Sequence, residues 1–507
     1  MTAPDFLALL PLLILAGAAV VVMLAAAIRR SHVLSAGLTV IGLVAALVSV
    51  RAAAPLAPRQ VTPLLVIDGF ALFYLALLVA GALAVALFAY GYLEQHSIER
   101  EEFYILLLVS TLGSAVLVCS RHFASFFLGL EVLSIGLYAL IAYFPDRPRP
   151  VEAGLKYLIL AAASAAFLLF GMALAYAALG TMEFDAIAAA SAGRTRVPGL
   201  LVVSGSALLV TGIGFKLAVV PFHMWTPDVY EGAPAPVSAF VATVSKGGMF
   251  ALLLRYFGPQ SILEGGPLVL VLSIVAIASM IAGNLLALRQ DNVKRILAYS
   301  SIAHLGYFLV AFLAGGPLGS KAATFYLAAY FVTILGAFGV VSMVSTETRD
   351  ADLIEDYRGL FWRRPVVGGV LSAMLLSLAG IPLTAGFVGK FYVVAAGAAS
   401  AAWALVMTLA ITSAIGLFYY LRVLVALYEP AGSGGVEAAS RGSTRAPAVL
   451  ALACLTVLLF WLGAYPSAVL ERIDRAMAAP GWAAPGSTSP GARSGQSDQP
   501  SAQPSRR

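Results

Sequence analysis

Four ionisable side chains lie in the middle of long apolar segments, where neighbouring residues offer them no water. They are Glu131, Lys216, Lys246 and Lys390. A charged group near the centre of a bilayer costs roughly 2.5 to 3.5 kcal/mol on insertion scales, so each is a functional candidate. A lysine in an apolar environment can lose its proton near neutral pH and then carries protons rather than a fixed charge. The four residues therefore predict proton transfer inside a membrane.

A static ion pair that only holds helices together is the simplest alternative for these groups. The three lysines outnumber the single mid-membrane carboxylate, so pairing cannot neutralise all of them. Some of them must titrate or bind water instead. A scaffold whose buried charges only hold subunits together stays open at this stage.

Three further polar residues are weaker candidates. His304 lies in a segment that joins the two halves of the chain and could bridge a proton path. His223 follows a proline, and a lone histidine in an apolar helix is more often a hydrogen-bonded structural residue. Lys156 lies near a helix end and could extend to the membrane interface, so its role stays open.

The composition indicates that the chain folds in a lipid bilayer rather than in water. Of 507 residues, 61% are hydrophobic and 11% are charged, against roughly 25% charged in soluble domains. A formal net charge of +6 is spread thinly, which excludes nucleic-acid binding. The two cysteines, Cys119 and Cys454, lie in apolar runs without metal-binding spacing, so neither a disulfide framework nor a metal site is expected.

Apolar stretches of about 20 residues recur along the chain and predict about 14 transmembrane helices in an all-α, multi-pass membrane protein. Loops after odd-numbered spans hold about 14 Lys or Arg, against about 7 after even-numbered spans, which favours the odd loops as cytoplasmic. The predicted spans are residues 6–28, 33–50, 70–92, 103–119, 123–143, 154–179, 200–220, 237–257, 268–288, 296–313, 326–344, 366–396, 403–428 and 446–462.

A short internal repeat links two of these spans. The hexapeptide Leu217–Phe222 reappears, by like-for-like exchange, as Leu378–Leu383, in the seventh and twelfth spans. An odd separation places the copies in opposite orientations, as in the inverted repeats of transporters, although chance similarity is the alternative. Each copy contains a proline, which predicts two discontinuous helices whose freed carbonyls, of Leu217 and Leu378, need polar partners or water.

Two longer segments carry a resemblance to a known family. The run from Phe215 to Pro234 (FKLAVVPFHMWTPDVYEGAP) and the run from Asp291 to Ser301 (DNVKRILAYSS) resemble the antiporter-like membrane subunits of respiratory complex I, which are related to Mrp-type cation/proton antiporters. The resemblance covers nearly the whole chain before the C-terminal tail. It implies a fold of 14 helices with two inverted five-helix repeats.

The resemblance also implies how the chain is organised. Residues 1–100 would form three N-terminal helices, 101–260 the first repeat, 261–430 the second, inverted repeat and 431–475 the last helix. Residues 476–507, rich in Gly, Pro, Ser and Gln, would form a disordered polar tail.

The family's proton-translocating residues match positions of this chain one by one. By resemblance, Glu131 is the glutamate of the fifth helix, Lys216 the lysine of the broken seventh helix, Lys246 that of the eighth and Lys390 that of the broken twelfth. The implied activity is proton translocation as a membrane subunit of an NADH:quinone oxidoreductase in the bacterial inner membrane.

The implied partners are the lipid bilayer and the other membrane subunits, including related antiporter-like subunits. NADH, flavin, iron-sulfur clusters and quinone would be bound elsewhere in the complex, with no cofactor or metal in this chain. A subunit of an Mrp-type Na+/H+ antiporter or of a membrane-bound hydrogenase is the alternative.

Overall fold

The computed structural model describes residues 1–96, 99–192, 199–257, 266–430 and 446–477, and this part of the chain is almost entirely helical. Thirteen of its helices are long and apolar enough to cross a membrane. Two shorter apolar helices, α17 (Pro365–Ala379) and α18 (Ala385–Ala399), together occupy the predicted twelfth span. The all-α, multi-pass fold is confirmed.

The remaining helices include the other predicted spans and several short helices that the apolar pattern did not predict. They are α1 (Ala3–Ala8), α2 (Leu10–Ile28), α3 (His32–Ala53), α4 (Gly69–Glu94), α5 (Glu101–Cys119), α6 (Phe123–Ile141), α7 (Pro148–Leu179), α8 (Phe184–Ala192), α9 (Leu200–Leu217), α10 (Trp225–Gly232), α11 (Ala235–Phe240), α12 (Lys246–Phe257), α13 (Pro267–Ala287), α14 (Val293–Ala314), α15 (Gly316–Val344), α16 (Leu360–Arg363), α19 (Trp403–Tyr428), α20 (Ala446–Ala464) and α21 (Ser467–Met477). Short connecting elements are the 3-10 turns η1 (Ala54–Leu56) and η4 (Ile354–Tyr357), the π-helical turn η2 (Val241–Ser245) and the strands β1 (Arg59–Gln60) and β2 (Val66–Ile67), which pair as a small antiparallel hairpin.

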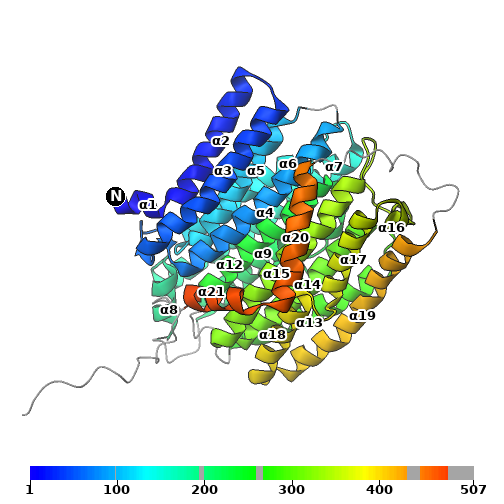
Figure 1. Ribbon diagram of the computed structural model, residues 1–507. Helices are drawn as coiled ribbons and strands as arrows, with labels where there is room; N and C mark the ends of the chain where they lie inside the picture. The colour runs from blue at the N-terminus through cyan, green and yellow to red at the C-terminus, as the bar shows by residue number, and fades with distance from the viewer. Residues whose placement is uncertain (97–98, 193–198, 258–265, 431–445, 478–507) are drawn as a thin grey trace, which may run out of the picture.

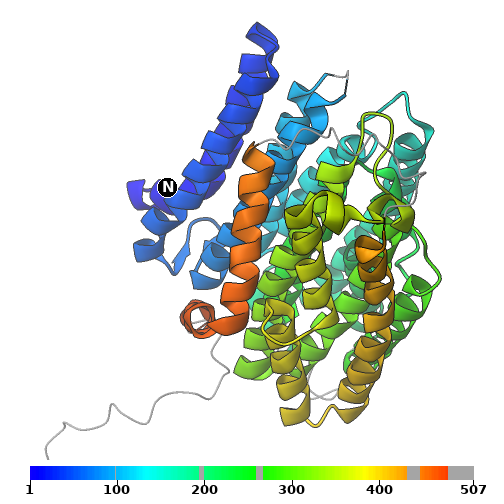
Figure 2. The same ribbon diagram turned by 45° about the vertical axis from the view of Figure 1, so that its right-hand side comes forward.

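The helices form one bundle, with the N-terminal helices at one flank and the last two helices, α20 and α21, on the face turned to the viewer in Figure 1 (Figures 1 and 2). Helices α2 and α3 stand at one flank beside the N-terminus, and α19 stands at the other. Helix α15 runs through the interior and contacts α4, α11, α14, α17, α18 and α20. Helix α20 crosses the bundle, and α21 lies across its foot (Figure 1).

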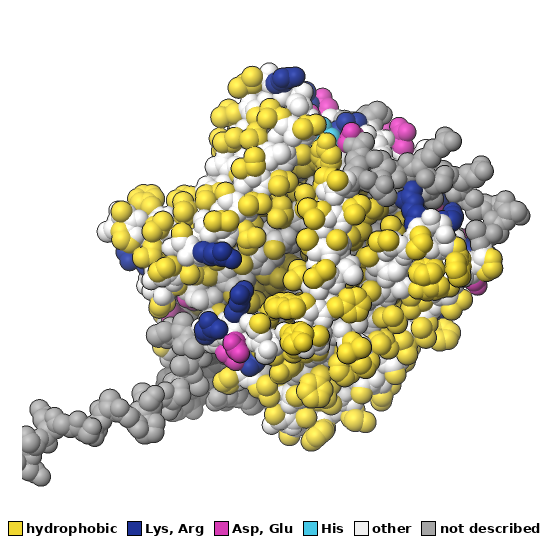
Figure 3. Space-filling view, viewed as in Figure 1, with side chains coloured by type: hydrophobic (Ala, Val, Ile, Leu, Met, Phe, Trp, Pro, Cys, Tyr) yellow, Lys and Arg dark blue, Asp and Glu magenta, His cyan; other side chains and the backbone are white. Residues whose placement is uncertain are grey.

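The outer surface has the character of a protein that faces lipid. Hydrophobic side chains cover most of the face in Figure 3, and the few charged groups on it lie at the top, at the right-hand edge and at the lower left. Exposed large hydrophobic residues occur on α2, α7, α13, α19 and α20. Their exposure is what a bilayer requires and water would penalise.

Contacts recur between corresponding helices of the two halves. Helix α5 packs against α6 and α12, and α13 packs against α14 and α19. Helix α7 contacts α6 and α9, and α15 contacts α14, α17 and α18. This recurrence is what an internal five-helix repeat requires. The first two residues of the predicted tail, 476 and 477, belong to α21, which ends at Met477, and residues 478–507 lie outside the described part.

A buried ion pair ties the end of α12 to the start of α4. Asp68 caps α4 by accepting from the Ala71 amide at 2.7 Å, and Arg255 donates twice to its carboxylate at 2.8 and 2.9 Å. The Arg255 side chain is 9% exposed and that of Asp68 is 11% exposed. Breaking such a pair leaves an uncompensated buried charge, whereas removing both charges costs less.

We expect Asp68→Asn, which keeps the helix cap, to lower the free energy of unfolding by about 3 to 5 kcal/mol. The double variant Asp68→Asn/Arg255→Met should lose less, because no unpaired charge remains. Thermal unfolding in detergent measures both. Glu99→Gln, at the exposed pair with Arg30, serves as the control and should cost less than about 1 kcal/mol. A double variant less stable than Asp68→Asn would contradict this account.

Candidate functional site

Both predicted discontinuous helices are present, but they end before their prolines. Helix α9 stops at Leu217 because Ala218 takes a left-handed conformation, with φ of 62°, and α17 stops at Ala379 because Gly380 does so, with φ of 89°. Pro221 and Pro382 therefore lie in the connecting loops. The expectation that each proline interrupts a continuing helix was wrong in this detail, since a left-handed residue already ends each helix.

Lys216 lies in the last turn of α9 and is 3% exposed. Its Nζ donates to Tyr157 OH at 2.7 Å and to Ser134 Oγ at 3.0 Å, on α7 and α6. Both partners are hydroxyl groups, which can pass a proton on as well as hold an ammonium group.

Glu131 lies on α6, one turn before Ser134, and is only half-buried. The described ion pairs do not include one between Glu131 and Lys216. The Lys216 ammonium group donates to Ser134 and Tyr157 instead. On the same helix Leu128 and Ile135 are 58% and 61% exposed, so Glu131 lies beside an outward-facing stripe. Glu131 therefore interacts with Lys216 electrostatically and not through a hydrogen bond.

Lys246 begins α12 directly after the π-helical turn η2, and it is 2% exposed. Its Nζ donates to Ser301 Oγ at 2.8 Å. Tyr330 OH also donates to Ser301 Oγ at 2.8 Å, and the Tyr230 ring centre lies 5.3 Å from the ammonium nitrogen. A π-helical turn changes the direction of side chains within a helix and is frequent at functional sites.

His304 follows Ser301 by one turn on α14 and is 3% exposed. Its Nδ1 is 2.7 Å from Tyr326 OH and its Nε2 is 3.3 Å from Tyr420 OH. Tyr420 in turn hydrogen-bonds Ser300. The histidine is thus enclosed by tyrosines from α15 and α19.

Lys390 lies in α18 and meets the end of the broken helix α17. Its Nζ donates at 2.9 Å to the carbonyls of Leu378 and Ala379, and at 2.7 Å to Ser413 Oγ of α19. These carbonyls belong to the last turn of α17, where a helix leaves acceptors unpaired. The predicted need of the Leu378 carbonyl for a polar partner is met by the lysine itself.

The candidate residues form successive polar groups along the bundle, joined by aromatic side chains. The Trp225 ring centre lies 5.0 Å from that of Tyr157 and 6.0 Å from Lys246 Nζ. The Tyr307 ring, one turn beyond His304, lies 5.4 Å from Lys390 Nζ. The described side-chain hydrogen bonds do not run without interruption from Lys216 to Lys390.

The two remaining candidates lie apart from this line. Lys156 is 45% exposed at the side chain and pairs with Glu152 at 2.7 Å and Asp228 at 2.8 Å, near an end of the bundle. His223 is buried in the loop after α9, and its Nδ1 has no hydrogen-bond partner among the described residues.

Sequence reasoning overlooked most hydroxyl partners and one buried charge cluster. Lys294 is 1% exposed and donates to Asp350 Oδ2 at 2.6 Å, and Tyr92 OH donates to the other oxygen of Asp350 at 2.6 Å. Asp352 lies 3.7 Å from Lys294. The two aspartates follow α15 in a charged loop that looked like an ordinary membrane-edge loop, so only the tertiary structure reveals their burial. Within the described residues, no group of three or more His, Cys, Asp or Glu is placed to hold a metal ion.

A multi-pass helical bundle with charged side chains at two helix breaks defines an antiporter-like membrane protein. The family model of the NADH:quinone oxidoreductase/Mrp antiporter transmembrane domain matches residues 120–416, and the chain belongs to this family. It is 50% identical over 484 residues to NADH-quinone oxidoreductase subunit N of Ectopseudomonas mendocina, covering 94% of this chain and 97% of that protein. It is 49% identical over 475 residues to the subunit N of Methylococcus capsulatus, covering 93% and 95% of the two chains.

Solved structures share the fold. A chain of respiratory complex I from Thermus thermophilus is 34% identical, with a TM-score of 0.78 over 91% of this chain and 98% of that one. A chain of an archaeal membrane-bound sulfane sulfur reductase, at 24% identity, has a TM-score of 0.82 over 92% and 96% of the two chains. A chain of the Mrp complex from Dietzia, at 21% identity, has a TM-score of 0.81 over 94% and 97%. The last two show the fold alone.

We expect Gly380→Ala to disturb the Lys390 site. An added Cβ would lie 2.9 Å from the Lys390 Cδ, and the φ of 89° disfavours a side chain. The variant should lose about 1 to 3 kcal/mol of stability. Gly369→Ala, within α17 and with open space around it, is the control and should be neutral or stabilising by up to about 1 kcal/mol. Equal unfolding temperatures for the two variants in detergent would show that Gly380 is not required for its conformation or for its approach to Lys390.

A pH dependence of stability follows from Asp352. Burial, together with the nearby charges of Asp350 and Glu231, raises the pKa of Asp352 from 3.8 to about 6, although Lys294 opposes the shift. The folded protein therefore holds this proton more tightly than the unfolded chain, so the resulting stability is present below pH 3.8 and is lost as the pH rises through 6.

Asp352→Asn should therefore gain in unfolding temperature over the unmodified protein between about pH 4 and 6 and keep that advantage at pH 7. Thermal unfolding across this range measures the difference. An advantage of the unmodified protein that grows as the pH rises would contradict the shift.

Proposed function

We propose that this chain is a proton-translocating membrane subunit of an NADH-quinone oxidoreductase in a bacterial inner membrane. The observation that carries the proposal is the line of buried ionisable groups at two helix breaks, in a chain about half identical to curated subunit N proteins over nearly its whole length. Its partners are then the other membrane subunits of the complex, including related antiporter-like subunits.

The proposed proton path starts at Lys216 and ends at Lys390. Glu131 stabilises the ammonium form of Lys216 through its charge, so movement of Glu131 towards or away from the lysine changes how tightly Lys216 holds its proton. The hydroxyls of Ser134 and Tyr157 provide alternative partners for the lysine when it is neutral. The proton released from Lys216 then passes to Lys246.

The second half of the path follows α14. Lys246 donates to the Ser301 hydroxyl group, which would release its own proton as it accepts the one from the lysine. His304, one turn further along the helix and hydrogen-bonded to Tyr326 and Tyr420, would take up the released proton. Lys390 accepts it at the break of α17, where two carbonyls and Ser413 stabilise the charged form. Water or side-chain motion must bridge the aromatic contacts between these groups. Lys156 and His223 take supporting positions outside this path.

The proposal places the redox chemistry in other subunits. NADH, flavin, iron-sulfur clusters and quinone would be bound elsewhere in the complex, and the energy of electron transfer would reach this chain through contacts between subunits. A cluster of iron and sulfur is usually held by four cysteines, whereas this chain has two, Cys119, which is buried, and Cys454, which is exposed.

The proposed division of the chain follows the recurring contacts. Residues 1–100 supply three helices, 101–260 and 261–430 the two inverted repeats, 431–475 the last membrane helix and 476–507 a polar tail. Each repeat then contributes one broken helix and its lysine, α9 with Lys216 and α18 with Lys390.

A subunit of an Mrp-type Na+/H+ antiporter or a membrane-bound hydrogenase is the second candidate. The fold shared with the Mrp complex supports it, at 21% identity. The near-complete match at about half identity to subunit N proteins favours the oxidoreductase. Neighbouring genes for NADH-binding and iron-sulfur subunits would support the oxidoreductase, and a cluster of small antiporter subunits would contradict it.

We expect Lys216→Ala, Glu131→Ala and Lys390→Ala each to reduce proton pumping driven by NADH oxidation by about tenfold or more, because each removes a proton-holding group. The measurement is quenching of a pH-sensitive dye in inverted membrane vesicles, with assembly of the complex checked on native gels. Lys321→Ala is the matched control, since Lys321 is a lysine at a helix end paired with Asp474. Unchanged pumping in all three variants would overturn the mechanism and favour a scaffold.

A further inference from the structure

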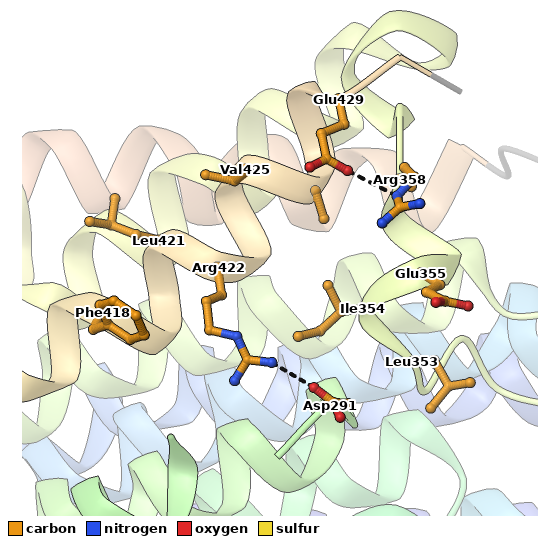
Figure 4. A pocket seen from close by; sticks show the side chains of 11 residues that line it. Asp291, Leu353, Ile354, Glu355, Arg358, Phe418, Leu421, Arg422, Val425 and Glu429 are labelled. Atoms are coloured by element: carbon orange, nitrogen blue, oxygen red, sulfur yellow. Dashed lines mark hydrogen bonds and ion pairs between the residues drawn. The ribbon is translucent and has the colours of Figure 1, made fainter. Parts of the chain in front are cut away.

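A cavity of about 620 Å³ opens where η4 meets the end of α19, away from the line of buried lysines (Figure 4). Its apolar wall is one face of α19, with Phe418, Leu421 and Val425 at 62%, 41% and 58% exposure. These positions recur at helical spacing on a membrane-crossing helix, so the wall continues the surface that meets lipid.

The polar end of the cavity lies at the level of the membrane interface. Trp362 is 65% exposed and donates from Nε1 to the Tyr428 carbonyl at 2.8 Å, and the Phe361 ring lies 4.5 Å from the Tyr428 ring. Tryptophan and tyrosine concentrate at the headgroup level of a bilayer. The aromatic group at the end of α19 therefore marks where headgroups begin, next to the cavity's charged residues.

The charged residues of the cavity carry both signs. Arg422 donates to Asp291 at 2.5 Å and to the Leu288 carbonyl at 2.8 Å, and Arg358 donates to Glu429 at 2.9 Å. Glu355 also lines the cavity and has no ion pair among the described residues. Figure 4 shows Arg422 paired with Asp291, Arg358 paired with Glu429, and Glu355 on the other side of Arg358.

These pairs are open to exchange with a ligand. Asp291 is 80% exposed at the side chain, and the Arg358–Glu429 partners are 51% and 42% exposed. Exposed ion pairs contribute little stability, whereas a phosphate group can accept two parallel hydrogen bonds from an arginine. A phosphate group can therefore replace a carboxylate as the acceptor of an arginine with little loss of folding free energy.

We propose that this cavity binds an aminophospholipid of the surrounding bilayer. The phosphate would accept from Arg422 and Arg358, the ammonium group would donate to Glu355 and Glu429, and one acyl chain would lie along Phe418, Leu421 and Val425. Because the cavity holds three carboxylates and two arginines, a lipid without an amine would bring a net negative charge to carboxylates that it cannot pair.

The proposed lipid would lie against α19, a helix that also contributes to the buried row of proton-carrying groups. Phe418 and Leu421 face the cavity, while Tyr419 and Tyr420, between them in the sequence, are each 1% exposed and face the interior. The same helix supplies Ser413 to Lys390. The lipid site itself does not depend on the proposed function.

The test uses the full-length chain in its membrane complex, reconstituted into nanodiscs that hold phosphatidylethanolamine and phosphatidylglycerol in roughly equal amounts. One of the two lipids carries a photoreactive acyl chain, and labelled peptides are identified by mass spectrometry. We expect the ethanolamine lipid to label the α19 segment around Phe418–Val425 at least about fivefold more than the glycerol lipid, because only the former pairs with Glu355 and Glu429.

Arg358→Gln/Arg422→Gln, which removes the donors to the phosphate, should reduce labelling by the ethanolamine lipid, while Arg289→Gln, at an exposed arginine of the adjacent loop outside the cavity, should leave that labelling unchanged. Glu355→Gln, which leaves the existing ion pairs intact, should also reduce labelling by the ethanolamine lipid. Equal labelling by both lipids, or a cross-link from α19 to another subunit in place of lipid, would overturn the proposal.

Discussion

Placing an ammonium group inside a membrane protein is the constraint on which the remaining structure depends. Continuous helices use their own carbonyls and leave nothing for a lysine to donate to. The fold meets this constraint in two ways. At Lys390 it ends a helix early and exposes the carbonyls of Leu378 and Ala379. At Lys216 and Lys246 it supplies hydroxyls from neighbouring helices, Tyr157 and Ser301 among them.

Each solution imposes its own requirements on the helices nearby. The breaks need left-handed residues, and Gly380 meets that need with an approach to Lys390 that leaves no room for a side chain. The hydroxyl partners need helices held in register, and α14 presents Ser301 and His304 one turn apart to two different neighbours. Buried ion pairs at the helix ends, such as Asp68 with Arg255, hold those helices in place relative to each other. The chemistry and the packing thus share the same elements.

The order of the long helices and the burial of Lys216, Lys246 and Lys390 were predictable, because long apolar runs and the charges within them are local properties of the sequence. Glu131, by contrast, is only half-buried. Residues 366–396 illustrate the limit: Pro382 predicted a break in this span, whereas the end of α17 at Gly380 depends on a left-handed backbone conformation. Hydrogen-bond partners such as Tyr326 and Tyr420 come from helices far away in the sequence and carry no signal of their own. The burial of Asp350 beside Lys294 could not be inferred, since it arises when a loop folds back onto α14.

The central claim is that the buried lysines themselves carry the translocated protons. The most direct test is the number of protons pumped per NADH oxidised by the complex in proteoliposomes, compared between the unmodified protein and Lys246→Met, which keeps most of the side-chain volume without the ammonium group. We expect this ratio to fall in the variant while the complex stays assembled. An assembled Lys246→Met complex that pumps the same number of protons per NADH would contradict it.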